Sequence, residues 1–168
     1  MTTEQALSRM AALCSTAEHC EADIRRKLQR TDLTADDMQA VIDRLYADGY
    51  LDTRRYCRAY ASDQMRFAHW GPQKIAAALR SKQLPEADID EALALLPDDE
   101  HNALLARLLR DKLRHTPQPT RQKLVRYAIG RGFTYDEICR QLDALHAQRG
   151  TAAADPCMAD SSSASSDF

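Results

Sequence analysis

Basic residues occur at matching positions in three successive segments of the chain, and such a series of cations could bind one extended anionic surface. With the single tryptophan, they form the candidate partner-binding set: Arg25, Arg26, Lys27, Lys74, Arg80, Lys82, Lys123, Arg126 and Trp70. We call the eight cations the basic stripe. A soluble helix also exposes lysine and arginine without any partner, so that alternative stays open for each residue taken singly. Placement on three equivalent helices favours a shared face.

Trp70 has two interpretations. It precedes Gly71-Pro72, a helix start, and its ring can pack as a hydrophobic staple onto Ile75. An exposed indole at this position could equally anchor an interface. Both interpretations stay open.

No group of residues has the spacing of a catalytic or metal site. The histidines are scattered, without a nucleophile or a second ligand at a suitable spacing: His19, His69, His101, His115 and His146. The cysteines form no C-x-x-C pair and are expected to be reduced: Cys14, Cys20, Cys57, Cys139 and Cys157. There is also no P-loop and no G-x-G-x-x-G motif. We expect no catalysis, no metal and no cofactor.

Charge is balanced in total but uneven along the chain. The sequence has 23 Lys and Arg against 25 Asp and Glu, which argues against holding nucleic acid by bulk positive charge. Residues 54–82 and 107–131 are strongly basic, whereas residues 86–100 contain seven acidic residues and no basic one. The surface should therefore carry stripes of positive and of negative charge. The first ten residues have no apolar h-region and no stretch is apolar enough to span a membrane, so we expect a cytoplasmic protein. We also expect it to be a monomer.

Six apolar positions recur in three blocks, without a gap inside any block. The first block contains Ile24, Leu28, Leu33, Met38, Ile42 and Leu45. The same pattern returns 51 residues later as Ile75, Leu79, Leu84, Ile89, Leu93 and Leu96. After 49 more residues it returns as Leu124, Ala128, Phe133, Ile138, Leu142 and Leu145. A period near 50 is typical of a modular array whose units cover one another's apolar faces.

The spacing of three and four inside each block predicts helices, with almost no strand. In the second block we expect a first helix over about residues 54–67 and a second from Pro72 to about Arg80. The fold class is therefore all-α, with three tandem three-helix repeats in an elongated array. The repeats should span residues 1–52, 53–98 and 99–146, followed by a disordered tail over 147–168, which is rich in Ser and Ala.

Two segments resemble a known family, the RecX regulatory proteins of bacteria. The first block carries Ala22-Asp23-Ile24-Arg25-Arg26-Lys27-Leu28, then Val41-Ile42-Asp43-Arg44-Leu45 and Asp48-Gly49-Tyr50-Leu51-Asp52. The second carries Trp70-Gly71-Pro72-Gln73-Lys74-Ile75-Ala76-Ala77-Ala78-Leu79 and Ile89-Asp90-Glu91-Ala92-Leu93. The chain departs from the usual pattern at Cys20, where serine is common, and at Thr31-Asp32, where a basic-Gly pair is usual. The third block matches loosely.

The resemblance implies a curved array that inhibits the RecA recombinase by binding along, or capping, its nucleoprotein filament, in DNA repair and the SOS response. It implies a regulator and not an enzyme. Contact with single- or double-stranded DNA would be weak and salt-sensitive. The alternative function is a direct DNA-binding protein, because pairs of short helices resemble helix-turn-helix units. A generic helical adaptor is a third interpretation.

Overall fold

The computed structural model describes the backbone of residues 1–152 and the side chains of residues 1–149. Within this part of the chain every regular element is a helix, and η1 is a π-helical turn. The elements are α1 (Thr3–Thr16), α2 (Glu21–Leu28), α3 (Ala35–Ala47), α4 (Thr53–Asp63), η1 (Gln64–Ala68), α5 (Pro72–Ser81), α6 (Glu86–Ala94), α7 (Asp98–His115), α8 (Arg121–Arg131) and α9 (Tyr135–Ala152).

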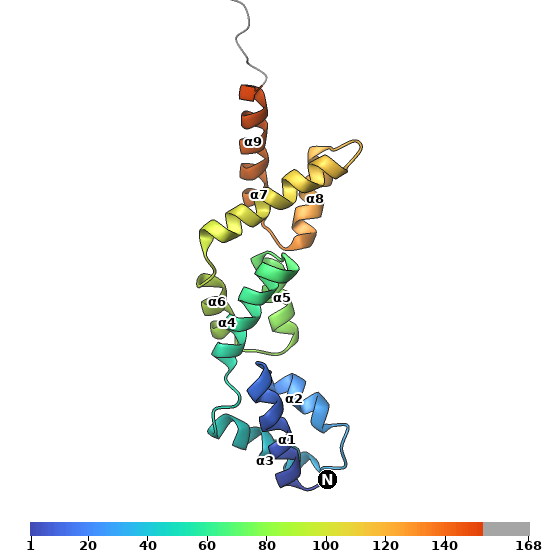
Figure 1. Ribbon diagram of the computed structural model, residues 1–168, viewed down its shortest axis with the longest axis vertical. Coiled ribbons are helices and arrows are strands. Elements are labelled where there is room, and N and C mark those ends of the chain that lie inside the picture. Colours follow the sequence, from blue (N-terminus) through green and yellow to red (C-terminus); the bar gives the residue numbers. More distant parts are fainter. Residues whose placement is uncertain (153–168) are drawn as a thin grey trace, which may run out of the picture.

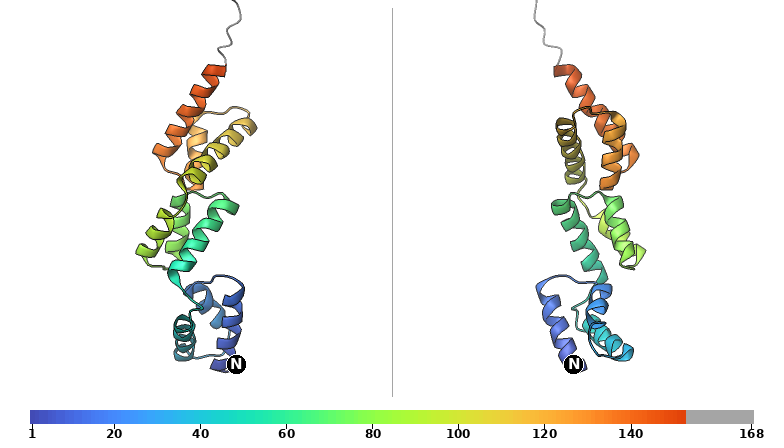
Figure 2. Two further views of the ribbon diagram at one scale, coloured as in Figure 1. Left: turned by 60° about the vertical axis from the view of Figure 1, so that its left-hand side comes forward. Right: turned by 90° about the vertical axis from the view of Figure 1, so that its right-hand side faces the viewer.

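The helices form three groups of three that follow one another along the long axis of the molecule (Figure 1). The groups are α1–α3, α4–α6 and α7–α9, and we call them repeats 1, 2 and 3. The turned views in Figure 2 show the same succession, so the elongation does not depend on the direction of view. The expected all-α array of three-helix repeats is confirmed.

Two helix boundaries differ from those expected. α9 continues to Ala152, past residue 147, where the tail was expected to begin, and the extension starts with the good helix formers Ala147, Gln148 and Arg149. The rest of that tail, residues 153–168, lies outside the described residues. The first helix of repeat 2 does not stay α-helical to residue 67 but changes to the π turn at Gln64 and ends at His69, where φ is 57°.

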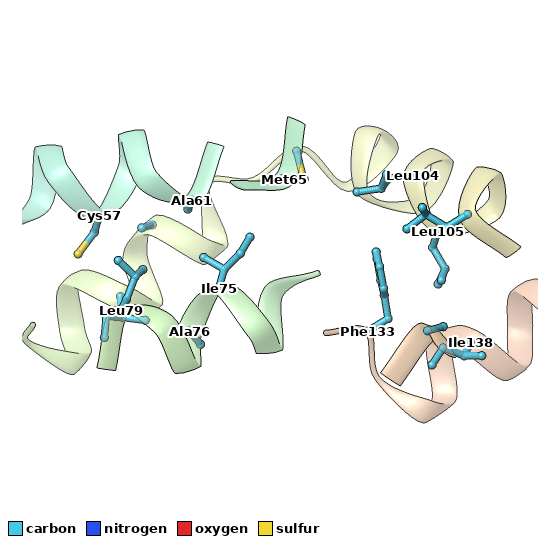
Figure 3. Packing of buried hydrophobic residues seen from close by; sticks show 14 of the residues in the cluster. Cys57, Ala61, Met65, Ile75, Ala76, Leu79, Leu104, Leu105, Phe133 and Ile138 are labelled. Atoms are coloured by element: carbon cyan, nitrogen blue, oxygen red, sulfur yellow. The ribbon is translucent and has the colours of Figure 1, made fainter. Parts of the chain in front are cut away.

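The recurring apolar positions form the core. All eighteen are buried or half-buried, so the face assigned from the sequence is the packed face. They fall into two hydrophobic clusters, one within repeat 1 and one that runs through repeats 2 and 3. Figure 3 shows the second cluster crossing between repeats, with Met65 and Ile75 on one side and Leu104, Leu105 and Phe133 on the other.

Truncating a recurring core residue should destabilise the protein strongly. Leu79 is fully buried, and we expect Leu79→Ala to lower the free energy of unfolding by about 2 to 5 kcal/mol, because lost burial adds to the cost of a cavity. Gln73→Ala is the control, since its side chain is exposed on the same helix. Denaturant midpoints in which the two variants are equal would contradict this core.

The second helices of the three repeats stack end to end in a column (Figure 1). The amides of Gly71 and Gln73 at the start of α5 donate to the carbonyls of Arg131 and Gly132 at the end of α8, at 2.7 and 2.9 Å. The end of α5 meets the start of α2 through Lys82, whose Nζ lies 3.0 Å from Asp23 Oδ2. In both junctions the negative end of one helix dipole faces the positive end of the next.

The two junctions are held together differently. Between repeats 2 and 3, backbone touches backbone, and a Cβ built on Gly71 would lie 2.5 Å from the Gly132 carbonyl oxygen. Between repeats 1 and 2, Lys82 pairs with Asp23 and Arg55 pairs with Glu18 at 2.6 Å. The buried Cys20 of repeat 1 also packs into the cluster of repeat 2. At the junction of repeats 2 and 3, Gly71 and Gly132 therefore permit a close approach of the two backbones that a residue with a Cβ would prevent.

Each repeat contains one polar contact that sequence analysis did not anticipate. The third residue of its third helix is acidic and is hydrogen-bonded to a first-turn side chain of its first helix. The pairs are Thr3 Oγ1 to Asp37 Oδ1 (3.3 Å), Thr53 Oγ1 to Asp88 Oδ2 (2.7 Å) and His101 Nε2 with Glu137 Oε1 (3.1 Å). The acids are separated by the same 51 and 49 residues as the apolar positions, so the polar contact repeats with the core and joins the third helix of each repeat to the first.

In repeat 3 this contact should make stability depend on pH. Burial acts to raise the pKa of Glu137, but hydrogen bonds from Thr134 and the nearby His101 outweigh it and hold the pKa below its usual value. A lowered pKa contributes stability that is present above the unfolded value, about 4.3, and is lost as pH falls through the folded one. We expect Glu137→Gln to cost about 1 to 3 kcal/mol at neutral pH and much less near pH 3.

Urea denaturation of both proteins at the two pH values measures this difference. The control is Asp136→Asn, one residue away, exposed and outside the contact. An equal loss for Glu137→Gln at both pH values would show that the carboxylate charge is not what stabilises the helix pair.

Candidate binding surface

The basic stripe lies on the column of second helices. Its members sit on α2, on α5 and the residue that follows it, and on α8: Arg25, Arg26 and Lys27, then Lys74, Arg80 and Lys82, then Lys123 and Arg126. The recurring apolar positions of all three helices lie in the core, so the cations lie off the packed face of each helix. Their starts differ: Cys20 precedes α2 without a capping hydrogen bond, Gly71 and Pro72 begin α5, and Thr120 caps α8 by accepting a hydrogen bond from the Lys123 amide.

Three stripe residues meet in a groove at the junction of repeats 1 and 2. Arg25, Arg26 and Lys82 line this space of about 460 Å³. The remaining lining residues come from α2, α3, the start of α4 and the segment after α5: Glu21, Ala22, Gln29, Tyr46, Thr53, Gln83, Leu84 and Pro85. We call it the junction groove. The sequence places Arg25 and Arg26 on one helix and Lys82 in the next block, and the stacking of α5 onto α2 brings Lys82 to the other two.

Asp23 controls the charge of the junction groove. Its carboxylate accepts from Lys82 and, at 2.7 Å, from Arg26, and it is only 13% exposed. Burial acts to raise the pKa of Asp23, but the Cys20 thiol, Lys82 and Arg26 together hold it below the usual value. Two cations of the stripe thus share one ionised carboxylate, and the groove is less positive than the sequence suggested.

Two further stripe residues are also paired. Arg25 lies 2.7 Å from Glu21, and Arg80 forms an ion pair with Glu86. Exposed pairs of this kind contribute little to stability, so a partner can displace them at small cost. The Asp23–Arg26 pair had a signal in the sequence, a spacing of three on a helix. The Asp23–Lys82 pair spans 59 residues and had none.

Three stripe residues, Lys27, Lys123 and Arg126, are exposed and form no ion pair with any described residue. Lys74 lies over the ring of Trp70, 4.6 Å from its centroid. Trp70 itself packs against the cluster that contains Ile75, as the staple interpretation requires, and keeps part of its ring at the surface. Lys123 Nζ donates only to the Gln118 carbonyl oxygen, at 3.1 Å. We call Lys27, Lys123 and Arg126 the free cations of the column, because none of them has a carboxylate partner among the described residues.

The arrangement suits non-covalent binding along a surface. No group of three or more His, Cys, Asp or Glu side chains within residues 1–149 is placed to hold a metal ion. None of the described helices is both long and apolar enough to cross a membrane. Cations spread along a column of stacked helices can make many weak contacts with an extended partner.

These features define an all-helical repeat protein, and comparisons identify its family. Residues 52–93 match the family described as "RecX, second three-helix domain". The chain is 33% identical over 129 residues to a regulatory protein RecX of Thermus thermophilus, covering 77% of this chain and 84% of that protein. It is 29% identical over 144 residues to the RecX of Prosthecochloris aestuarii, covering 85% and 95%.

Solved structures of RecX proteins have the same fold as this chain. A crystal structure of a regulatory protein RecX matches with a TM-score of 0.76 and 26% identity, over 84% of this chain and 71% of that one. The RecX of Lactobacillus salivarius shows the same fold, with a TM-score of 0.75 at 19% identity, over 86% of this chain and 97% of that one. This chain belongs to the RecX family of regulatory proteins.

Proposed function

We propose that this protein inhibits the RecA recombinase in the cytoplasm by binding along its nucleoprotein filament as a non-catalytic monomer. The observation that supports this most is the shape: an elongated stack of three repeats whose polar surface is extended and not gathered around one pocket. A filament offers the same surface on successive subunits, so a stack of like repeats can engage it at several points. Membership of the RecX family supports the choice of partner.

The basic stripe supplies the contacts in this proposal. The free cations Lys123 and Arg126 on α8 and the junction groove between α2 and α5 lie along one column, so they can act together. Each contact is worth little alone, since exposed ion pairs contribute at most about 1 kcal/mol. Binding therefore depends on simultaneous engagement, which a partner presenting isolated subunits would not allow.

Direct binding to free DNA is the weaker candidate. Arg25, Arg26, Arg80 and Lys82 are already paired with carboxylates of the chain, which lowers the charge available to phosphates. Bulk electrostatic binding to DNA loses affinity steeply as salt rises. Binding to a filament with protein contacts should lose much less.

A titration with three partners tests the proposal. The protein is added to RecA on single-stranded DNA, to RecA alone and to the DNA alone, at low and at physiological salt, with ATP hydrolysis, strand exchange and fluorescence anisotropy as readouts. We expect inhibition and tight binding only with the filament at physiological salt. Equal affinity for bare DNA at that salt would favour the DNA-binding alternative.

A further inference from the structure

Two clefts at opposite ends of the array share one chemistry. In repeat 1, between α1 and the end of α2, Arg9, Lys27 and Arg30 surround the apolar side chains of Met10 and Leu13 in a cleft of about 340 Å³. We call this the N-terminal cleft. α1 and α2 lie at one end of the molecule, with α9 at the other (Figure 1).

The second cleft lies between the ends of α7 and α9. Arg110, Arg114 and Arg149 surround Leu113 and Leu145 in a cleft of about 280 Å³, the C-terminal cleft. Like the N-terminal cleft, it joins three cations to an apolar floor. Neither cleft has an acidic side chain among its described lining residues, whereas Glu21 lines the junction groove.

No carboxylate within residues 1–149 neutralises the cations of the two clefts, and Arg110 Nε donates to the Ala106 carbonyl oxygen at 3.2 Å. Within residues 1–149 none of the six forms an ion pair, unlike most arginines of the middle of the molecule. Three like charges around an apolar floor repel one another until an anion lies between them. Arginine binds a carboxylate through two parallel hydrogen bonds, and the floor can bury an apolar side chain beside it.

We propose that the two clefts bind two copies of one acidic protein segment that also carries an apolar side chain. The N-terminal cleft is at the small end of the range for ligand pockets and the C-terminal cleft lies just below it, so each holds a few side chains and not a folded element. Nucleic acid fits less well, because no aromatic side chain lines either cleft and unpaired bases are held mainly by stacking on aromatic rings. Like clefts at the two ends of one chain suit a partner that repeats, and this choice of partner rests on the proposed function.

A peptide titration tests the clefts without any recombinase. The probes are a fluorescent peptide of glutamates and leucines, the same peptide with glutamines for its glutamates, an oligothymidine of equal charge, and a tandem peptide with two copies on a flexible linker. We expect two acidic peptides per chain by calorimetry. The tandem peptide should bind at least about tenfold more tightly than the single copy, because its second copy binds from a high effective concentration.

Variants assign each peptide to a cleft. Arg9→Gln with Arg30→Gln should remove one of the two sites, Arg110→Gln with Arg114→Gln the other, and either pair should abolish the tandem gain. The matched control, Arg44→Gln with Arg66→Gln, removes the same charge from arginines that are already paired with acids, and should keep both sites. Helicity by circular dichroism confirms that each variant is folded.

The inference is overturned if the glutamine peptide binds as well as the acidic one, if the cleft variants keep two sites, or if the control loses as much affinity as they do. Oligothymidine that displaces the acidic peptide at equal concentration would assign the clefts to nucleic acid, which also overturns it. Recombinase inhibition by the wild-type chain is measured in parallel. If the wild-type chain inhibits the recombinase but does not bind the peptides, only the proposal about the clefts is rejected. If it binds the peptides but does not inhibit the recombinase, only the proposed function is rejected.

Discussion

Reversing one stripe cation in each repeat should reduce recombinase inhibition by about tenfold or more. The variant combines Arg26→Glu, Lys74→Glu and Lys123→Glu, which lie on α2, α5 and α8 and off the recurring apolar positions. Each reversal replaces an attraction of about 1 kcal/mol by a repulsion, and the three sites are far enough apart for their effects to add. The concentration that halves strand exchange, at matched ionic strength, measures the loss.

The control reverses the same number of charges away from the column. Arg44→Glu, Arg58→Glu and Arg140→Glu change one exposed arginine per repeat, on α3, α4 and α9. We expect this variant to keep most of its activity. If both variants inhibit the recombinase equally well, the stripe is only a solvated surface, and the binding face lies elsewhere, first of all around Trp70 and the repeat junctions. Thermal melts separate lost binding from lost folding.

Replacing Gly132 by alanine should cost about 3 to 5 kcal/mol of stability, the largest single-residue effect expected outside the core. Gly132 has φ of 99°, a conformation that costs an L-residue about 1 to 2 kcal/mol. Its new Cβ would also lie 2.6 Å from the Lys74 amide nitrogen and 2.8 Å from the Gly71 carbonyl oxygen. Backbone atoms cannot move aside as a flexible side chain can, so the junction of repeats 2 and 3 must open.

Two other glycines separate the cost of the positive φ from the cost of the steric clash. Gly49 has φ of 75° but nothing within 4 Å of a built Cβ, so Gly49→Ala should pay only the conformational cost, about 1 kcal/mol. Gly130 lies inside α8 with open space around it, and Gly130→Ala should stabilise the helix by up to about 1 kcal/mol. The urea midpoint should be lowest for Gly132→Ala, higher for Gly49→Ala and highest for Gly130→Ala. A Gly132→Ala protein no less stable than Gly49→Ala would mean that the junction yields easily.

Much of the architecture could be predicted because its signals are local and repeated. The apolar positions define one face of each helix, and a period of about 50 residues defines three units. Helix starts follow from neighbouring residues, as when Thr34 accepts a hydrogen bond from the Asp37 amide or Pro72 follows Gly71. The π turn after Asp63 could not be anticipated, because the same residues also satisfy an α-helical pattern and packing chose between the two.

The charge of the candidate binding surface could be predicted only in part from the sequence. The sequence by itself placed the basic stripe on the second helices, because equivalent residues on equivalent helices follow from the repeat alone. Arg25, Arg26 and Arg80 pair with acids close to them in the sequence. The pairing of Lys82 was decided only when α5 stacked on α2, since that contact brings Lys82 to Asp23 across 59 residues. The two terminal clefts also come from packing, as Arg9 and Arg30, or Arg114 and Arg149, meet only where their helices converge. Charge positions are local, whereas charge pairing depends on distances of a few ångströms between distant parts of the chain.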